Sequence, residues 1–322
     1  MVLKNRRTLA TTASYSASTT STIALPRDFL IQRINLSFVG TTVNSGLAVL
    51  VSGAPFSLMK YVRVKAVGEG SSRTIYEVKG EDFGNLNLFQ YGKAVKNQHS
   101  PTATGTCTNG LQFFGTIDMR TDFSDPDDFS VAVPSYLLST LQLEIEWDTV
   151  ALGYGTNNTS VNGTLTVSLV EGIPEPSDPD FSTNPLQTTL YKELNGDTSS
   201  GSTEQFSTFF NVGSLIRSNF LITETSGGVL SDAEIEYYTV TSGNIPLISK
   251  QNFRDAKQQD IEDWGVPCGK TLFGDTNSST GTINTILYPL VNSPTIATAG
   301  ATLTSGGQTI TGWTAIDFMN PK

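Results

Sequence analysis

Residue types suited to acid–base or nucleophilic chemistry are few in this sequence. The chain has one histidine, His99, in the polar stretch KNQHSPTATG, and no GxSxG motif accompanies it, so no serine nucleophile is paired with a histidine base. The metalloprotease motif HExxH and the phosphate-binding motif GxxxxGK[ST] are also absent. Gly68 and Gly70 lack the third glycine of a dinucleotide-binding loop. We therefore expect no catalytic residues, no enzymatic activity and no cofactor.

Carboxylates are the remaining side chains that could act in catalysis, because two of them suffice to hydrolyse a glycoside. Nothing in the sequence identifies such a pair, so a glycosidase stays open as an alternative. The densest acidic cluster, in RTDFSDPDDF, contains Asp125, Asp127 and Asp128, whose oxygens are weak candidates for a calcium site. The cluster lacks the glycine and distal glutamate of an EF-hand loop, and its Asp-Pro step predicts an ordinary turn. No bound metal is expected.

Three basic residues, Lys4, Arg6 and Arg7, stand near the N-terminus of a chain whose formal net charge is −10. The Ser/Thr/Ala-rich sequence after them offers little to fill a core. We therefore predict an N-terminal arm over residues 1–22 whose charges contact an anionic surface, either a membrane or a genome. The alternative is a frayed terminus with incidental charges. A protein surface that binds nucleic acid over a wide area would need a stripe of basic residues. The negative net charge of the chain disfavours such a stripe.

The elements that must position these residues are predominantly strands. Charged residues make up only 16% of the chain, against about 25% in an average soluble domain. Apolar and polar residues alternate over 141–147, LQLEIEW, as is typical of a half-buried strand. The same alternation recurs over 34–38, 62–66 and 165–169. Helical spacing is confined to 81–91 and 252–264.

Prolines mark an internal boundary. Four of them fall within the polar stretch 173–187, where they disfavour a central strand and hold the backbone extended. We interpret this stretch as a linker between a domain at 23–172 and a second domain at 188–322. Both pieces are close to the usual domain size of about 100–150 residues.

The two pieces also look like diverged copies of one unit. Each contains a lysine, a phenylalanine, a polar helix and an aromatic-Gly pair in the same order, from Lys79 to Gly92 and from Lys250 to Gly265. Early strands are expected at 31–39 and 60–67 in the first piece, and at 218–223 and 234–240 in the second. Strand-rich pieces of this length with one short helix favour an eight-stranded double Greek key over a propeller or an immunoglobulin-like sandwich. The predicted fold is all-β, with two tandem eight-stranded jelly-roll β-barrels and a short helix in each.

Several short motifs stand out in the first half of the chain. They are the basic start of the chain, the strand after IALP at 23–26, the segment 83–95 that ends QYGKAV, the stretch 136–147 and the strand GTLTVSLVE at 163–171. Together they resemble a known family, the double jelly-roll major capsid proteins of tailless, lipid-containing icosahedral phages of the corticovirus type and their relatives. In the second half the resemblance depends on strand order and on 253–265. The Gly/Thr-rich sequence from Pro294 departs from the family pattern.

The resemblance implies a structural protein whose homotrimers form pseudo-hexameric units and tile an icosahedral shell. It implies contacts with neighbouring trimers and with minor capsid and vertex proteins. It also implies contacts with an internal membrane or genome through Lys4, Arg6 and Arg7. The protein would be made in the host cytoplasm and reside in the virion, with long loops at 96–110 and 153–163 forming outer or trimer contacts. A carbohydrate-binding or adhesin sandwich that uses exposed aromatics such as Tyr154 or Tyr237 is the alternative from another class.

Overall fold

The computed structural model describes residues 3–51, 53–68, 71–91, 97–99, 107–120, 125–173, 218–222, 235–252, 255–256, 294–295, 304–305 and 313–317 of the 322-residue chain. The chain divides into two compact units. Unit 1 comprises Met1–Lys192 with Gly269–Gln308, and unit 2 comprises Glu193–Cys268 with Thr309–Lys322. The proposed linker at 173–187 lies outside the described residues except for Ile173.

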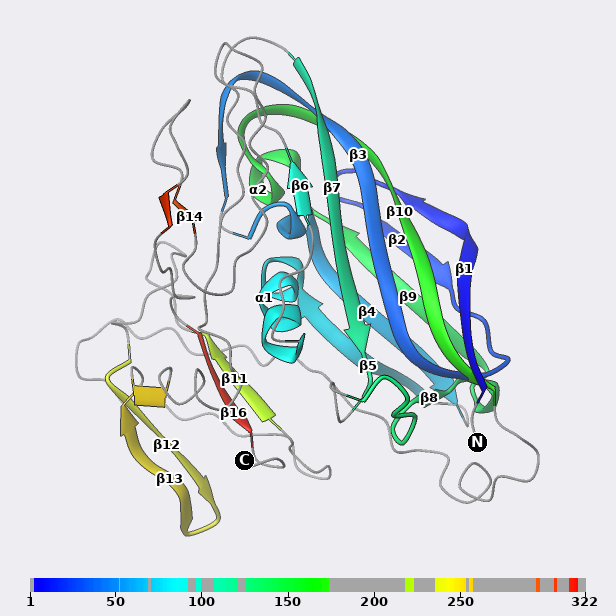
Figure 1. The fold of residues 1–322 in the computed structure, drawn as a ribbon, viewed down its shortest axis with the longest axis vertical. Helices are drawn as coiled ribbons and strands as arrows, with labels where there is room; N and C mark the ends of the chain where they lie inside the picture. The colour runs from blue at the N-terminus through cyan, green and yellow to red at the C-terminus, as the bar shows by residue number, and fades with distance from the viewer. Residues whose placement is uncertain are drawn as a thin grey trace. The chain divides into compact units, whose positions relative to one another are not determined.

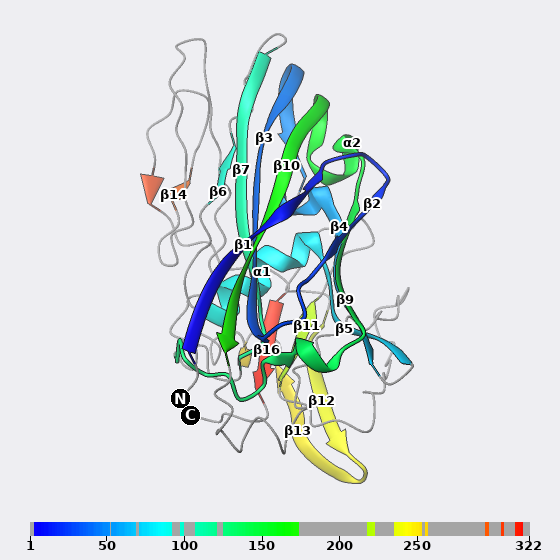
Figure 2. The ribbon, with the colours of Figure 1, turned by 90° about the vertical axis from the view of Figure 1, so that its right-hand side faces the viewer.

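The described strands of unit 1 between Leu3 and Ile173 form two antiparallel sheets, which appear as separate layers in Figure 2. The larger sheet consists of β1 (Leu3–Ser14), β10 (Gly155–Ile173), β3 (Leu30–Leu50), β7 (Cys107–Asp118) and β6 (Asn97–His99) in that order, with β8 (Val133–Pro134) paired to β3. The smaller sheet consists of β2 (Thr20–Ala24), β9 (Thr140–Trp147), β4 (Met59–Gly68) and β5 (Ser71–Lys79). The short helices are η1 (Phe56–Leu58), α1 (Gly80–Tyr91), η2 (Ser135–Leu137) and α2 (Val150–Gly153).

The strand order of unit 1 is that of a jelly roll. The first strand of the chain pairs with the last of the sandwich, β1 with β10, and the next pair inward, β2 with β9, forms the start of the opposite sheet. This wrapping of one long hairpin into two sheets is the double Greek key. Figure 1 shows β1, β3, β7 and β10 running side by side as the larger layer.

The predicted N-terminal arm is corrected by this topology. Residues 3–14 form β1, an edge strand paired with β10 from Leu3↔Ile173 to Ser14↔Thr164, and residues 20–24 form β2. The sequence suggested an arm because β1 is mostly exposed and therefore carries little apolar alternation, yet Ala13 is buried. An edge strand obtains much of its stability from the hydrogen-bond ladder and cross-strand pairs rather than from its own apolar face.

The strands predicted from alternation are confirmed within unit 1. Side chains at alternate positions point to opposite faces of a strand, and Leu141, Leu143, Ile145 and Trp147 of β9 are all buried between the sheets. The patterns at 34–38, 62–66 and 165–169 likewise fall in β3, β4 and β10 with their apolar residues buried. The helix predicted at 81–91 is α1.

Aromatic side chains join the two sheets. The ring of Phe38 in β3 stacks on that of Phe113 in β7 with centroids 4.8 Å apart, and it lies 5.8 Å from the ring of Trp147 on the opposite sheet. Phe83 of α1 is fully buried and meets the rings of Phe56 and Tyr76 at 6.0 and 6.4 Å. The short helix therefore contributes to the core rather than lying on the surface.

Helix α1 also provides hydrogen-bond partners for backbone groups at the edge of β7. The buried side-chain amide of Asn87 donates to the backbone carbonyl of Thr116 at 3.0 Å, and its oxygen accepts from the Thr116 amide at 2.7 Å. One side chain thus makes the two hydrogen bonds that a neighbouring strand would make. Buried backbone groups need such partners because an unpaired one costs about 1–3 kcal/mol.

The segment 153–163, predicted as a long loop, is strand over most of its length. From Gly155 onward it belongs to β10 and pairs with β3, beginning with Gly155↔Leu50. Asn157 has a positive φ of 63°, and the register shifts on both sides of Asn158. The turn-forming residues that suggested a loop therefore produce irregularities within a strand pair, as β-bulges do.

Unit 2 is described in two antiparallel pairs. One joins β11 (Ser218–Ile222) to β16 (Trp313–Asp317), and the other is a hairpin of β12 (Tyr237–Ser242) and β13 (Ile245–Asn252). The strands predicted at 218–223 and 234–240 match β11 and β12 to within a few residues. The helix predicted at 252–264 lies largely outside the described residues, apart from a helical pair at 255–256, and Asn252 itself ends β13. A further short pair, β14 (Pro294–Thr295) with β15 (Thr304–Ser305), falls in the unit 1 portion.

Candidate interaction surface

Lys4 is held within the protein. Its Nζ lies 2.8 Å from Oδ1 of Asp127 and donates to the carbonyl of Pro126 at 2.6 Å. The pKa of the Asp127 carboxyl is lowered, chiefly by this hydrogen bond. The bond joins β1 to the turn that contains the acidic cluster, so Lys4 stabilises a local contact.

Arg7 is also held within the protein. Its Nη2 lies 2.6 Å from Oε1 of the fully buried Glu171 in β10, and its Nη1 lies 3.2 Å from Oδ2 of Asp28. Burial opposes the charge of Arg7, but hydrogen bonds to Glu171 and then Asp28 outweigh that effect and raise its pKa. Asn5 donates to the second oxygen of Glu171 at 3.2 Å. A buried carboxylate requires such partners, because removal of one leaves an uncompensated charge.

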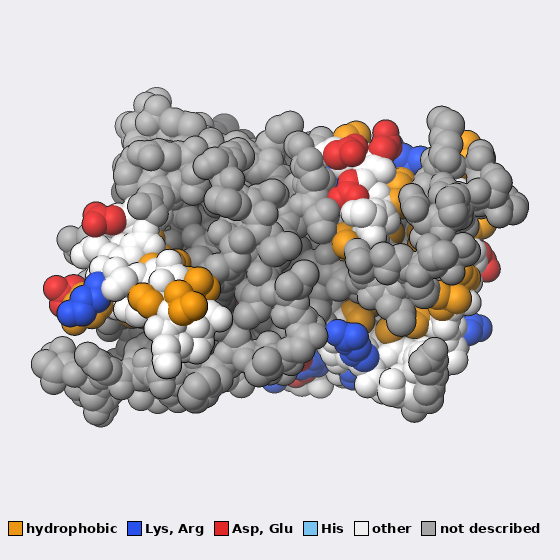
Figure 3. Space-filling model, turned by 90° about the horizontal axis from the view of Figure 1, so that it is seen from below, with side chains coloured by type: hydrophobic (Ala, Val, Ile, Leu, Met, Phe, Trp, Pro, Cys, Tyr) orange, Lys and Arg blue, Asp and Glu red, His pale blue; other side chains and the backbone are white. Residues whose placement is uncertain are grey.

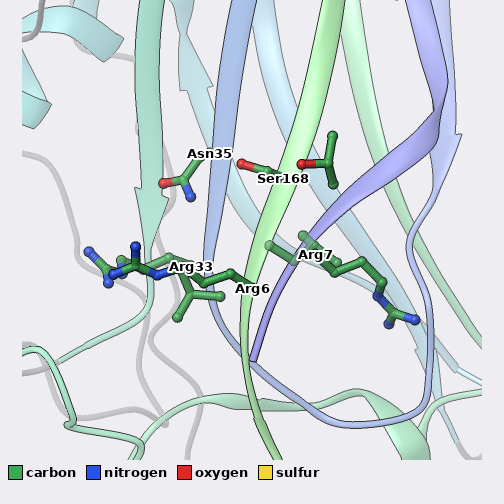
Figure 4. Close-up of a pocket in the computed structure, with 8 residues that line it drawn as sticks. Arg6, Arg7, Arg33, Asn35 and Ser168 are labelled. Atoms are coloured by element: carbon green, nitrogen blue, oxygen red, sulfur yellow. The ribbon is translucent and has the colours of Figure 1, made fainter. Parts of the chain in front are cut away.

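Arg6 has a different environment, because alternation along β1 turns it to the opposite face from Arg7. Figure 4 shows Arg6 and Arg33 extending to one side of the sheet and Arg7 to the other. On that outer face lies a hollow of about 420 Å³ that spans β1, β10 and β3. It is lined by Arg6, Arg7, Thr8, Arg33, Asn35, Ser168, Leu169 and Val170. Of the three basic residues identified from the sequence, Arg6 is the one whose side chain is exposed on this outer face.

Two carboxylates of the acidic cluster accept hydrogen bonds within a turn. Oδ1 of Asp125 accepts from the amide of Asp127 at 2.8 Å, and Oδ1 of Asp128 accepts from the amide of Ser130 at 2.9 Å. Within the described ranges, no three His, Cys, Asp or Glu side chains are grouped to hold a metal ion. The turn that the Asp-Pro step predicted thus explains the positions of Asp125 and Asp128.

A buried ion pair supports this turn. Asp118 is fully buried; its Oδ1 accepts a hydrogen bond from Nε of Arg120 at 3.0 Å, and its Oδ2 accepts one from Nη2 at 2.7 Å. Nη1 of Arg120 donates to the carbonyl of Asp125 at 2.7 Å. A bidentate guanidinium–carboxylate pair is geometrically specific, so β7 and the turn at 125–130 are fixed to each other.

The outer face of the smaller sheet carries opposite charges in cross-strand pairs. Arg63 of β4 lies 2.7 Å from Glu77 of β5 and 2.8 Å from Glu146 of β9. Lys60 also reaches Glu146 at 2.8 Å, and the hydrogen bonds from Lys60 and Arg63 lower the pKa of the Glu146 carboxyl. This sheet therefore presents a ladder of opposite charges that are paired across its strands.

The aromatic residues proposed for sugar stacking differ in exposure. Tyr154 is fully buried, and its amide and carbonyl both form backbone hydrogen bonds, so the expectation that it stacks on a ligand is wrong. Tyr237 in unit 2 is 42% exposed, with Nζ of Lys250 5.4 Å from its ring centroid. Ile245 and Leu247 on the same hairpin are exposed, and hydrophobic side chains gather over it in Figure 3. Grouped exposed apolar side chains are typical of interaction surfaces.

Sequence comparison gives no relative: no protein-family model and no curated protein matches the chain. Comparison with solved structures finds similar folds. The protein in the atomic structure of Sulfolobus turreted icosahedral virus superposes with a TM-score of 0.59 and 17% identity over 81% of this chain and 76% of that one. The crystal structure of the major capsid protein of the same virus gives 0.53 and 18% identity over 82% and 81%. At this identity the likeness establishes the fold, which is the double jelly roll.

Arg33 was not identified from the sequence as a site residue. The alternation in IQRINLSF places it on the solvent face of a strand together with Asn35, but it stands 27 positions beyond Arg6 in the chain. Only the pairing of both strands with β10 brings the two arginines to one surface. A strand's neighbours depend on the tertiary fold, so alternation within the strand does not reveal them.

Proposed function

We propose that this chain is a structural major capsid protein that assembles into homotrimers, each a pseudo-hexameric tile of an icosahedral virus shell. The observation that carries the proposal is the double jelly-roll fold, shared over four fifths of the chain with a viral major capsid protein. Two jelly rolls in each of three chains would supply six similar lobes, which suit a hexagonal lattice. The protein acts in the virion, and its function consists of its contacts with copies of itself and with neighbouring shell components.

The absence of a recognised catalytic motif in the sequence and the state of the described carboxylates favour this role over a glycosidase. Three of these carboxylates form ion pairs with arginine side chains, with N···O distances of 2.6–2.8 Å: Asp118 with Arg120, Glu146 with Arg63 and Glu171 with Arg7. A retaining or inverting glycosidase needs one carboxyl as acid and another as base or nucleophile across a cleft. Carboxylates held in ion pairs between strands serve the stability of the barrel instead.

Finer features of the particle also belong to the proposal. The sequence resemblance to phages of the corticovirus type supports an internal membrane, whereas the similar structures come from a virus of Sulfolobus. We take the shell to enclose a membrane and genome, with Arg6 directed toward that anionic interior. Lys4 and Arg7 have smaller parts in such a contact, because Asp127 and Glu171 already neutralise them.

Sedimentation equilibrium of the purified chain tests self-assembly. The proposal predicts a mass three times that of the 34.6 kDa chain at micromolar concentration, with higher assemblies at greater concentration. A matched series in high salt separates contacts of charged residues from apolar contacts, because salt screens exposed charges. A single species of one-chain mass throughout would contradict the proposal.

A further inference from the structure

Two asparagine side chains lie opposite each other inside unit 1, where β3 pairs with β10. Asn44 of β3 and Asn158 of β10 are partners in the register of these strands. Directly opposite residues of an antiparallel pair project to the same face of the sheet, with Cβ atoms roughly 4.5–5.5 Å apart. Asn44 has no exposed surface, and Asn158 is 9% exposed. The two amides therefore face each other in the interior.

The inward face of β3 changes from apolar to polar along the strand. Its first residues with alternate spacing are buried and apolar: Ile34, Leu36 and Phe38. Further along the same face, Thr42 and Asn44 are fully buried and polar. Burial raises the pKa of Tyr154, and contact with the Thr42 hydroxyl partly offsets that rise, so Thr42 lies beside a second hydroxyl. The amides of Asn44 and Asn158 remain to be accounted for.

The orientation of the Asn158 amide is fixed by its backbone neighbours. Its Nδ2 donates to the carbonyl of Gly155 at 3.3 Å and to that of Thr156 at 3.4 Å. A carbonyl oxygen only accepts hydrogen bonds, so the nitrogen must lie on this side of the amide and Oδ1 on the other. Oδ1 of Asn158 is buried and has no hydrogen-bond partner among the described residues.

The amide of Asn44 is buried without a protein partner at either atom. Neither its Nδ2 nor its Oδ1 forms a hydrogen bond in the part of the chain that the structure describes. A direct bond from Nδ2 of Asn44 to Oδ1 of Asn158 would satisfy both residues in part, yet the two amides do not form one. Buried amides that have lost their hydrogen bonds to solvent are strongly disfavoured unless another group replaces those bonds. A small bridging group is therefore required between the two strands.

The donors and acceptors of the two amides fit a water molecule. Water can accept from Nδ2 of Asn44 and donate to the oxygens, and a buried water typically makes about three such bonds to groups that otherwise lack partners. A metal cation would bind the oxygens but would be repelled by the amide N–H groups, and divalent cations in proteins are usually held by carboxylates. An anion would be repelled by the two amide oxygens.

We infer that Asn44 and Asn158 bind at least one ordered water molecule, which bridges β3 and β10 inside unit 1. The register of these strands shifts on both sides of Asn158, so the water links them where their backbone ladder is irregular. The site goes beyond the proposed function and needs only a folded unit 1. It can therefore fail while the capsid role stands, and the reverse is also true.

A crystal structure of the full chain at a resolution that shows ordered water tests the site directly. We expect a density peak about 2.7–3.2 Å from Oδ1 of Asn158 and from the amide of Asn44. A peak with oxygen neighbours alone at about 2.0–2.6 Å is a cation and overturns the inference. A direct hydrogen bond between the two amides, or no peak between them, also overturns it.

Urea unfolding of Asn44→Leu provides a second test, because leucine has a similar size and no hydrogen-bonding group. If water bridges the amides, the substitution should lower the urea midpoint, since Oδ1 of Asn158 loses its donor. If the Asn44 amide is dry, the midpoint should rise, since two unpaired buried atoms are removed. Asn162→Leu removes the same group at an exposed position of β10 and should leave the midpoint close to that of the wild type.

The two tests together decide the inference. An unchanged or raised midpoint in Asn44→Leu overturns it, as does an equal fall in Asn44→Leu and Asn162→Leu. If Asn44→Leu does not fold, the crystal structure of the wild type still decides whether water occupies the site.

Discussion

Nη2 of Arg7 lies 2.6 Å from Oε1 of Glu171, a carboxylate whose side chain has no exposed surface, so charge ties the first strand of unit 1 to β10. Arg7→Ala should lower the free energy of unfolding by about 3 kcal/mol, because it leaves a buried carboxylate without its cation. Urea unfolding measures the change. Arg6→Ala is the matched control at the adjacent exposed position and should change stability by no more than about 0.5 kcal/mol. Equal effects of the two substitutions would contradict this account of β1.

Truncation tests whether β1 is an integral strand. Removal of residues 1–14 deletes a strand that pairs with β10 along its length and leaves Glu171 without Asn5 and Arg7. We expect the truncated chain to lose cooperative unfolding or to become insoluble, since the deletion also exposes the edge of β10. Removal of Met1 and Val2 alone, before β1 begins, is the control and should leave the unfolding midpoint unchanged. A 15–322 chain with native stability would restore the original interpretation of a dispensable arm.

That interpretation illustrates what the sequence can and cannot predict here. Strands buried on one face, such as β9, were predicted because each alternate residue must be apolar to fill the core. The edge strand β1 was missed because most of its side chains are exposed, so its Ser/Thr/Ala composition resembles that of an unstructured segment. Its assignment depends on hydrogen bonds to a strand far away in the sequence, for example where Arg7 lies opposite Leu169, 162 positions further on, and local composition does not report that pairing.

The candidate surface was predictable only in part. Arg6 was identified as a basic residue on an acidic chain, whereas the roles of Lys4 and Arg7 as internal ion-pair partners depend on Asp127 and Glu171, which are distant in sequence. Arg33 became a neighbour of Arg6 through the register of two strands with β10. The sequence thus identifies a basic residue, but the pairing of strands in the tertiary fold decides which face of the sheet it occupies and which carboxylate neutralises it.

Gly115 provides a test of how α1 packs on the larger sheet. A Cβ at this position would lie 2.1 Å from Cε1 of Phe83, well inside contact distance. Gly115→Ala should therefore displace the buried ring and lower the free energy of unfolding by about 1–3 kcal/mol. Thermal or urea unfolding measures this loss. Gly46→Ala in β3, where the nearest atoms would be 4.0 Å away, should have native or slightly higher stability, and a destabilisation as large as that of Gly115→Ala would show that the contact with Phe83 is not the cause.

Glu146 predicts a specific acid dependence of stability. Hydrogen bonds from Lys60 and then Arg63 lower the pKa of its carboxyl below the ordinary value of 4.5, against the effect of burial. A lowered folded-state pKa contributes stability that is present above pH 4.5 and lost as the pH falls through the folded pKa. The wild type should therefore unfold at a higher urea concentration than Glu146→Gln at pH 7, and the two midpoints should converge on acidification below pH 4.5. A gap between the midpoints that is independent of pH would argue against this linkage.

Electron microscopy of the purified full chain tests the central claim, self-assembly into shell units, most directly. The account predicts discrete particles of three chains with six lobes and pseudo-sixfold outline, which pack into hexagonal arrays as the concentration rises. Fields that contain only single two-lobed chains at micromolar concentration, with no trimers and no arrays, would contradict it.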